Sequence, residues 1–96
     1  MRLVTVYIDL MKYYEEIPTR ELTRIVASLK SEFSILEGVG YKKHYTKLSK
    51  PIQIICQSFI RNCESIREYG RTIAQYLYTI LDKSFVIVDM AIEEVL

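Results

Sequence analysis

The residues best suited to chemistry lie together in the middle of the chain, in segment 38–50. This segment carries four lysines and no acidic residue, so it concentrates positive charge in a chain whose net charge is only +1. Lysines offer point charges to phosphates, and tyrosine rings offer surfaces on which bases stack. The composition predicts either an ordinary solvated loop or a contact with DNA, RNA or an acidic protein. The contact would use the following residues: Tyr41, Lys42, Lys43, His44, Tyr45, Lys47 and Lys50.

His44 is the single histidine of the chain. Imidazole titrates near neutral pH, and the neighbouring lysines would disfavour its cationic form, as a general base requires. No second histidine or carboxylate accompanies His44 in segment 38–50. We therefore expect no catalytic role for it.

Four carboxylates could in principle pair for general acid–base catalysis: Asp9, Glu15, Glu16 and Asp89. Asp9 and Asp89 are the more informative pair because they interrupt apolar stretches, yet solvated edges or caps explain all four. Two cysteines and one histidine cannot supply the four ligands of a structural zinc site. The sequence predicts no enzyme, no metal and no cofactor.

The elements that position these residues are indicated by an apolar repeat. A large apolar residue recurs at every seventh position in the second half of the chain: Ile52, Phe59, Ile66, Ile73, Ile80 and Ile87. Such a heptad pattern is typical of one face of a long amphipathic helix with coiled-coil-like pairing. A helix over 51–96 would span ~69 Å at ~1.5 Å per residue. A break near Gly70 or Ser84 remains an alternative.

The same periodicity places Cys56 and Cys63 together in a row of small side chains beside the isoleucines. On a helix, a spacing of seven residues is about 10.5 Å, which is too far for a disulfide. We therefore expect two reduced, buried and unreactive thiols.

The first half of the chain predicts two helical pieces that meet near Pro18. Leu22, Leu29 and Leu36 repeat at seven and indicate a helix that begins at Pro18 or Thr19 and ends at Gly38. Residues 3–17 also fit a helical stripe. However, the β-branched residues in 3–8 alternate as in a strand, and 85–88 has strand composition too.

We therefore expect an all-α fold in a single domain over 1–96. A helical arm (1–37), a basic loop (38–50) and the heptad helix (51–96) would form an elongated hairpin, completed to a bundle by dimerisation. The alternative is a β-α-α-β fold with paired terminal strands. The predicted oligomer interface comprises Ile52, Phe59, Ile66, Ile73, Leu77, Ile80 and Ile87.

Composition limits the classes of function. Half of the residues are apolar, but no apolar run is long enough to span a membrane. An acidic residue occurs within the first nine positions, so the first apolar stretch is too short for a signal peptide. Few amides and many charges resemble the composition of small proteins from hyperthermophilic archaea and their viruses. We expect a cytoplasmic, non-enzymatic protein–protein interaction module, either a homo-oligomeric adaptor or an accessory subunit. The alternative is a sequence-indifferent nucleic-acid-binding protein that uses segment 41–50.

Overall fold

The predicted all-α bundle is wrong, because the chain folds into a four-stranded sheet with two helices. The computed structural model describes residues 1–33, 40–43 and 51–95, with only the backbone described in 40–43. The elements follow the chain in this order: β1 (Arg2–Lys12), α1 (Thr19–Phe33), β2 (Gly40–Lys43), β3 (Ile52–Ile60), α2 (Ile66–Ile80) and β4 (Phe85–Glu94).

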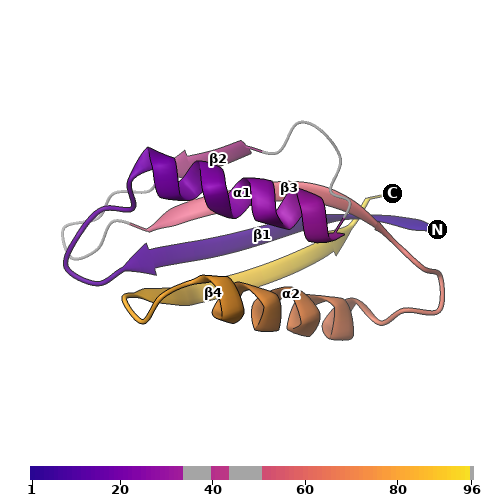
Figure 1. The fold of residues 1–96 in the computed structure, drawn as a ribbon. Helices are drawn as coiled ribbons and strands as arrows, with labels where there is room; N and C mark the ends of the chain where they lie inside the picture. The colour runs from indigo at the N-terminus through magenta and orange to yellow at the C-terminus, as the bar shows by residue number, and fades with distance from the viewer. Residues whose placement is uncertain (34–39, 44–50, 96) are drawn as a thin grey trace.

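The sheet has the strand order β2-β3-β1-β4, and all neighbouring strands are antiparallel. Both helices pack on one face of the sheet, and β1 and β3 lie at its centre (Figure 1). This β-α-β-β-α-β order is the split β-α-β arrangement of ferredoxin-like folds. The pairing of the first and last strands confirms the β-α-α-β alternative, which lacked only the two middle strands.

The central strands form because their side chains alternate between two environments. In β1 the buried residues are Val4, Val6, Ile8 and Leu10, each fully inaccessible to solvent. The register of β1 with β3 sets Ile8 opposite Ile54, so the buried residues of both strands face the helices. This two-residue period overrides the weaker helical stripe in 3–17, and the helix predicted there is wrong.

The long heptad helix is wrong for a related reason. Its six apolar positions fall in three separate elements, β3, α2 and β4. On a strand, residues seven apart point to opposite faces because the period is two. Ile52 is therefore buried at 3% exposure, whereas Phe59 is 49% exposed on the other face. The helical period holds only within α2, where Tyr69, Ile73 and Leu77 are buried.

Of the boundaries of the two helices, the start of α1 was predicted and the start of α2 was not. α1 begins at Thr19, as predicted, and buries Leu22, Ile25 and Leu29 against the sheet; its predicted stop at Gly38 lies outside the described residues. α2 begins after Ser65, whose hydroxyl accepts a hydrogen bond from the Glu68 N–H. α2 ends at Ile80, shortly before the break that was considered near Ser84.

One buried polar contact joins the sheet to α2. The hydroxyls of Ser58 on β3 and Tyr69 on α2 are 2.6 Å apart, and Phe33 at the end of α1 packs edge-on against Tyr69. Burial raises the pKa of Tyr69, which the hydrogen bond with Ser58 partly offsets. The contact sets the position of α2 along β3, because a shift would take the buried Tyr69 hydroxyl away from Ser58, its one described hydrogen-bond partner.

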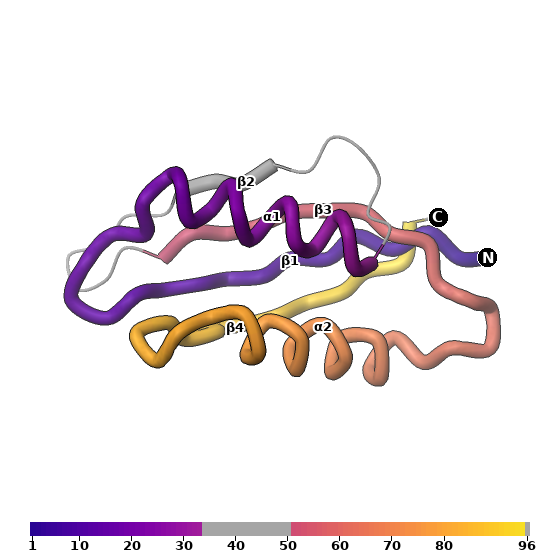
Figure 2. The backbone as a smooth tube through the Cα atoms, in the orientation of Figure 1, coloured from indigo at the N-terminus to yellow at the C-terminus, as the bar shows by residue number. Residues whose placement is uncertain are grey.

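The path of the backbone brings the two ends of the described chain together at one end of the sheet (Figure 2). There the Val95 N–H donates to the Leu3 carbonyl at 2.9 Å. The Arg2 guanidinium donates to the Glu94 carboxylate at 2.6 Å, and also to the carbonyl of Glu64. Among the described residues, no helix is long and apolar enough to cross a membrane.

Candidate functional site

The two edge strands of the sheet differ greatly in length. β2 has four residues, whereas β4 has ten and pairs only with β1 among the described strands. An unpaired edge presents a row of backbone donors and acceptors to any strand that approaches. The outer edge of β4 is therefore the longest stretch of unpaired sheet backbone in the described part of the chain.

The hydrogen bond at the end of β4 fixes which backbone groups face outward. Val95 donates to β1, and in an antiparallel pair the bonded positions alternate with the non-bonded ones. Ala91 and Glu93 therefore share the inward direction of Val95. The N–H groups of Ile92 and Glu94 point away from β1, toward the free edge. That of Met90 also points outward, but it donates to the Asp89 carboxylate at 2.9 Å.

A bulge divides β4 into two parts. The register passes from Asp9 opposite Asp89 to Leu10 opposite Ile87, which leaves Val88 without a partner on β1. Val88 is 55% exposed. Because bulges interrupt the ladder, the regular part available to an added strand is 89–94.

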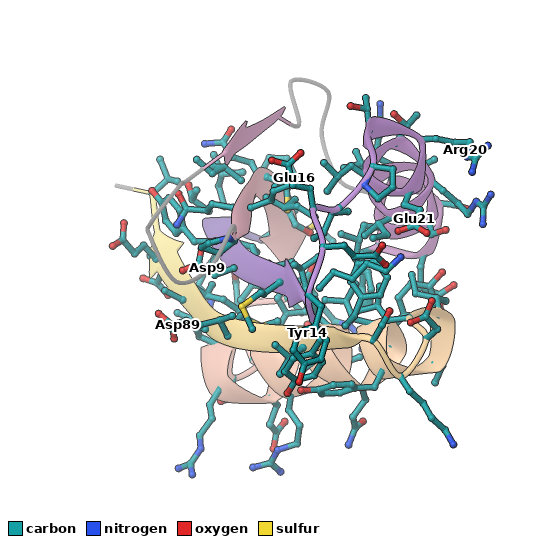
Figure 3. The ribbon with its side chains drawn as sticks, turned by 90° about the vertical axis from the view of Figure 1, so that its left-hand side faces the viewer. Asp9, Tyr14, Glu16, Arg20, Glu21 and Asp89 are labelled. Carbon is teal, nitrogen blue, oxygen red and sulfur yellow. The ribbon has the colours of Figure 1, made fainter. Side chains whose placement is uncertain are left out.

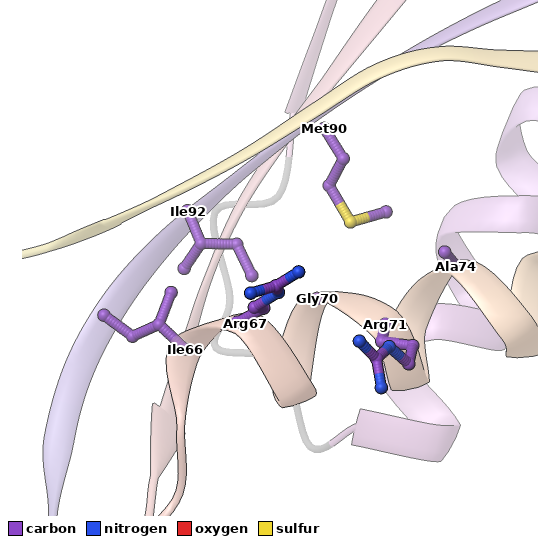
Figure 4. A pocket seen from close by; sticks show the side chains of 7 residues that line it. All are labelled: Ile66, Arg67, Gly70, Arg71, Ala74, Met90 and Ile92. Carbon is purple, nitrogen blue, oxygen red and sulfur yellow. The ribbon is translucent and has the colours of Figure 1, made fainter.

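Beside this regular part lies a groove between α2 and β4. Its volume is about 380 Å³, and Figure 4 shows Met90 and Ile92 facing the helix across it. The lining residues are Ile66, Arg67, Gly70, Arg71, Ala74, Met90 and Ile92. Gly70 keeps the groove open, because a Cβ at this position would lie 3.2 Å from Ile92 Cδ1 and 3.8 Å from Met90 Sδ.

The charge of the groove comes from two arginines on α2. Arg67 and Arg71 are one helical turn apart and exposed, and neither forms an ion pair with any described residue. The described ion pairs lie elsewhere, at Arg2 and Lys12. The groove thus combines an apolar lining with two available guanidinium groups.

The face of the sheet away from the helices has the opposite charge. Asp9 and Asp89 are directly opposite each other on β1 and β4, and both lie on this open face (Figure 3). Gln53 donates to Asp9 at 2.9 Å, and Asp89 accepts from the Met90 N–H. The structure brings these two carboxylates together, but no three potential metal ligands cluster among the described residues. They give the open face a negative charge.

The residues predicted as an oligomer interface are dispersed by the fold. Ile52, Ile73 and Leu77 lie in the core of the single chain, and Ile66 and Ile87 pack against it. Only two members of the set are largely exposed: Phe59 at 49% and Ile80 at 39%.

Most of the residues predicted to contact nucleic acid or an acidic partner lie outside the described residues. The backbone of Tyr41, Lys42 and Lys43 forms part of β2 and pairs with β3. The remaining members of the set, His44, Tyr45, Lys47 and Lys50, are outside the described residues.

The two cysteines have different environments, contrary to the expectation of two buried thiols. Cys56 is buried on β3 at 3% exposure, and burial raises its pKa to about 11. Cys63 lies in the connection from β3 to α2 and is exposed. The expectation is confirmed for Cys56 and wrong for Cys63, because no helix joins them.

The groove and the free edge were missed from the sequence. The available signal was Gly70 within a helical pattern, which was interpreted as an alternative break point of the helix and did not indicate its neighbours on β4. No model of a known protein family matches the sequence, and neither does any curated protein.

Proposed function

We propose that the protein is a non-enzymatic protein–protein interaction module that binds a partner by adding a strand to β4. The observation that carries the proposal is the outer edge of 89–94, which pairs with no described strand. In strand addition, backbone hydrogen bonds supply affinity and side-chain pockets supply specificity. The adjoining groove would act as such a pocket.

The composition of this edge supports binding. Soluble proteins commonly protect edges with proline, lysine, bulges or very short strands. β2 is very short, and β4 has a bulge at Val88, but 89–94 contains neither proline nor lysine. Three carboxylates (Asp89, Glu93 and Glu94) keep the edge from being a general aggregation surface. Two cysteines without a disulfide fit a cytoplasmic location.

Substitution of Met90 tests the proposal. Proline at this position removes an outward N–H, together with its hydrogen bond to the Asp89 carboxylate, while leaving the inward bonds to β1 in place. Edge strands tolerate proline in this direction. Peptides selected from a random displayed library should bind the wild-type protein and protect the amides of Met90, Ile92 and Glu94 from hydrogen exchange. Met90→Pro should weaken the binding of these peptides at least tenfold.

Met90→Ala is the matched control, because it also shortens the side chain but keeps the N–H. Binding of the selected peptides should be weakened clearly less by alanine than by proline. Equal loss in both variants would assign the contact to the Met90 side chain alone. Selected peptides that leave the three amides unprotected would overturn strand addition at β4.

We propose that self-association, where it occurs, uses the open face near Phe59. The register sets Leu3 opposite Phe59 and Tyr7 opposite Ile55, which groups four apolar or aromatic residues on neighbouring strands. Phe59 belongs to the interface predicted from the sequence and is half exposed. Sedimentation should show a concentration-dependent dimer that Phe59→Ser weakens. A monomer at all concentrations would contradict this surface.

Nucleic-acid binding is the second candidate function. It is favoured by one observation: the described backbone of the basic segment forms the edge strand at the opposite side of the sheet from β4. Replacement of Lys42, Lys43, Lys47 and Lys50 by glutamine should abolish binding to mixed-sequence DNA at low salt. Binding that survives in this variant would exclude the basic segment as the site.

A further inference from the structure

We infer that the strand added to β4 carries apolar and acidic side chains on its groove side and neutral or basic side chains on its other side. This inference rests on the proposed strand addition and names the chemistry of the partner. It follows from the different charges on the two sides of the same edge.

The groove side selects for apolar side chains flanked by carboxylates. Ile66, Met90 and Ile92 line the groove and are only partly buried, so a partner side chain would complete their burial. Arg67 and Arg71 stand beside this apolar surface without ion pairs to described residues. A guanidinium binds a carboxylate through two parallel hydrogen bonds, and a nearby apolar surface strengthens that interaction.

The open side selects against acidic side chains. Asp89 and Glu93 lie on the open face, on either side of Ala91. Like charges directly opposite each other on neighbouring strands are destabilising, whereas opposite charges stabilise the pair. A partner strand should therefore present lysine or threonine here, and its carboxylates should face the groove.

The same charges argue against a second copy of this chain as the occupant. Two copies paired through the outer edges of their β4 strands would bring the two groove arginines of each copy to the same interface. The one described carboxylate on the helix side of 89–94 is Glu94, which is already paired with Arg2. The partner is therefore a different polypeptide with an extended acidic-apolar segment.

Two seven-residue peptides of identical composition test this assignment. The first, Glu-Lys-Ile-Thr-Ile-Lys-Glu, places glutamates and isoleucines on one side of an extended strand and lysines and threonine on the other. The second, Lys-Glu-Ile-Thr-Ile-Glu-Lys, exchanges the charges between the two sides. Both are acetylated and amidated, and binding is measured by titration with amide detection at Met90, Ile92 and Gly70.

The first peptide should bind at least tenfold more tightly than the second. The double variant Arg67→Gln/Arg71→Gln should reduce this preference to less than about threefold, since it removes both charge-assisted pairs with the peptide glutamates. Arg24→Gln is the control, because Arg24 is an exposed arginine on α1. It should leave the preference unchanged.

The outcomes separate this inference from the proposed function. If both peptides bind equally and Met90→Pro weakens both, strand addition stands and the charge assignment fails. If neither peptide binds although library-selected peptides protect the β4 amides, the acidic-apolar chemistry is wrong. If decanoate shifts Gly70 and competes with the first peptide without protecting any β4 amide, the groove binds a small amphipathic acid instead.

Discussion

The β2 and β4 edges of the sheet show two ways in which a small domain can end a row of hydrogen bonds. β2 ends after four residues, so it offers few groups to another strand. β4 runs for ten residues, and its second half stays regular beyond the bulge at Val88. The contrast shows that an available edge depends on the length and regularity of the strand more than on its apolar content.

The β4 edge is supported by the elements around it. β4 lies beside α2, with Gly70 in contact distance of Ile92, and its far end is held by Arg2. For β2, the described contact is the backbone pairing with β3. The contacts with α2 and Arg2 hold the β4 edge in position, which is a property that a binding edge needs.

The largest effect should follow from removing the support of the β4 edge. Leu77 on α2 is fully buried, so Leu77→Ala should lower the free energy of unfolding by about 2–5 kcal/mol in urea denaturation. Tyr78→Ala, at the exposed neighbouring position, should change it by less than about 0.5 kcal/mol. A second transition in the Leu77 variant would show that the two edges unfold separately.

A smaller effect should follow from ionising Cys56 on the strand that carries β2. Because the pKa is about 11 in the folded chain against an ordinary value of 9.0, the folded state retains the proton between these values. Stability should therefore fall as pH rises from about 9 to 11, by about 3 kcal/mol at most. Urea denaturation should show a flatter pH profile for Cys56→Ala, and equal profiles would contradict the burial of the thiol.

The contacts of Arg2 at the end of β4 should contribute less to the free energy of unfolding. Arg2 bonds Glu94 and two carbonyls of the connection before α2, and its side chain is 30% exposed. Arg2→Ala should cost about 1–2 kcal/mol and speed hydrogen exchange at Val95. Glu94→Gln, which keeps an acceptor, should cost less than about 1 kcal/mol. Unchanged exchange at Val95 would show that β4 needs no clamp.

The smallest effect on stability should come from Gly70→Ala. Alanine favours the helix by about 1 kcal/mol, but its Cβ would meet the mobile end of Ile92 at 3.2 Å. We expect a net change within about 1 kcal/mol in thermal unfolding, together with weaker peptide binding in the narrowed groove. A loss above 2 kcal/mol would show that Ile92 cannot move.

The sequence predicted local features better than the arrangement of the elements. The start of α1 and the pairing of the terminal strands were anticipated, the latter as the alternative fold. β3 was missed although Ile52, Ile54 and Cys56 alternate with Gln53 and Gln57, because Ile55 and Phe59 on the open face obscured the two-residue period. The seven-residue apolar repeat was given more weight than this two-residue alternation.

The candidate site could not be predicted because it depends on strand order. Gly70 and Ile92 lie on different elements, and only the packing of α2 beside β4 brings them together. Likewise, nothing local in 89–94 indicates that it lies at an edge rather than at the centre of a sheet. The basic segment was visible from composition alone because its charges are adjacent in the chain.

The strand order has a consequence during synthesis. β1 is made first and lies at the centre, yet one of its two neighbours is β4, the last described strand to leave the ribosome. Until β4 arrives, the outer edge of β1 and the side of α2 that β4 covers remain open to other nascent chains. Crowded translation at high expression should therefore favour misassembly at the β1 edge, which β4 covers in the finished protein.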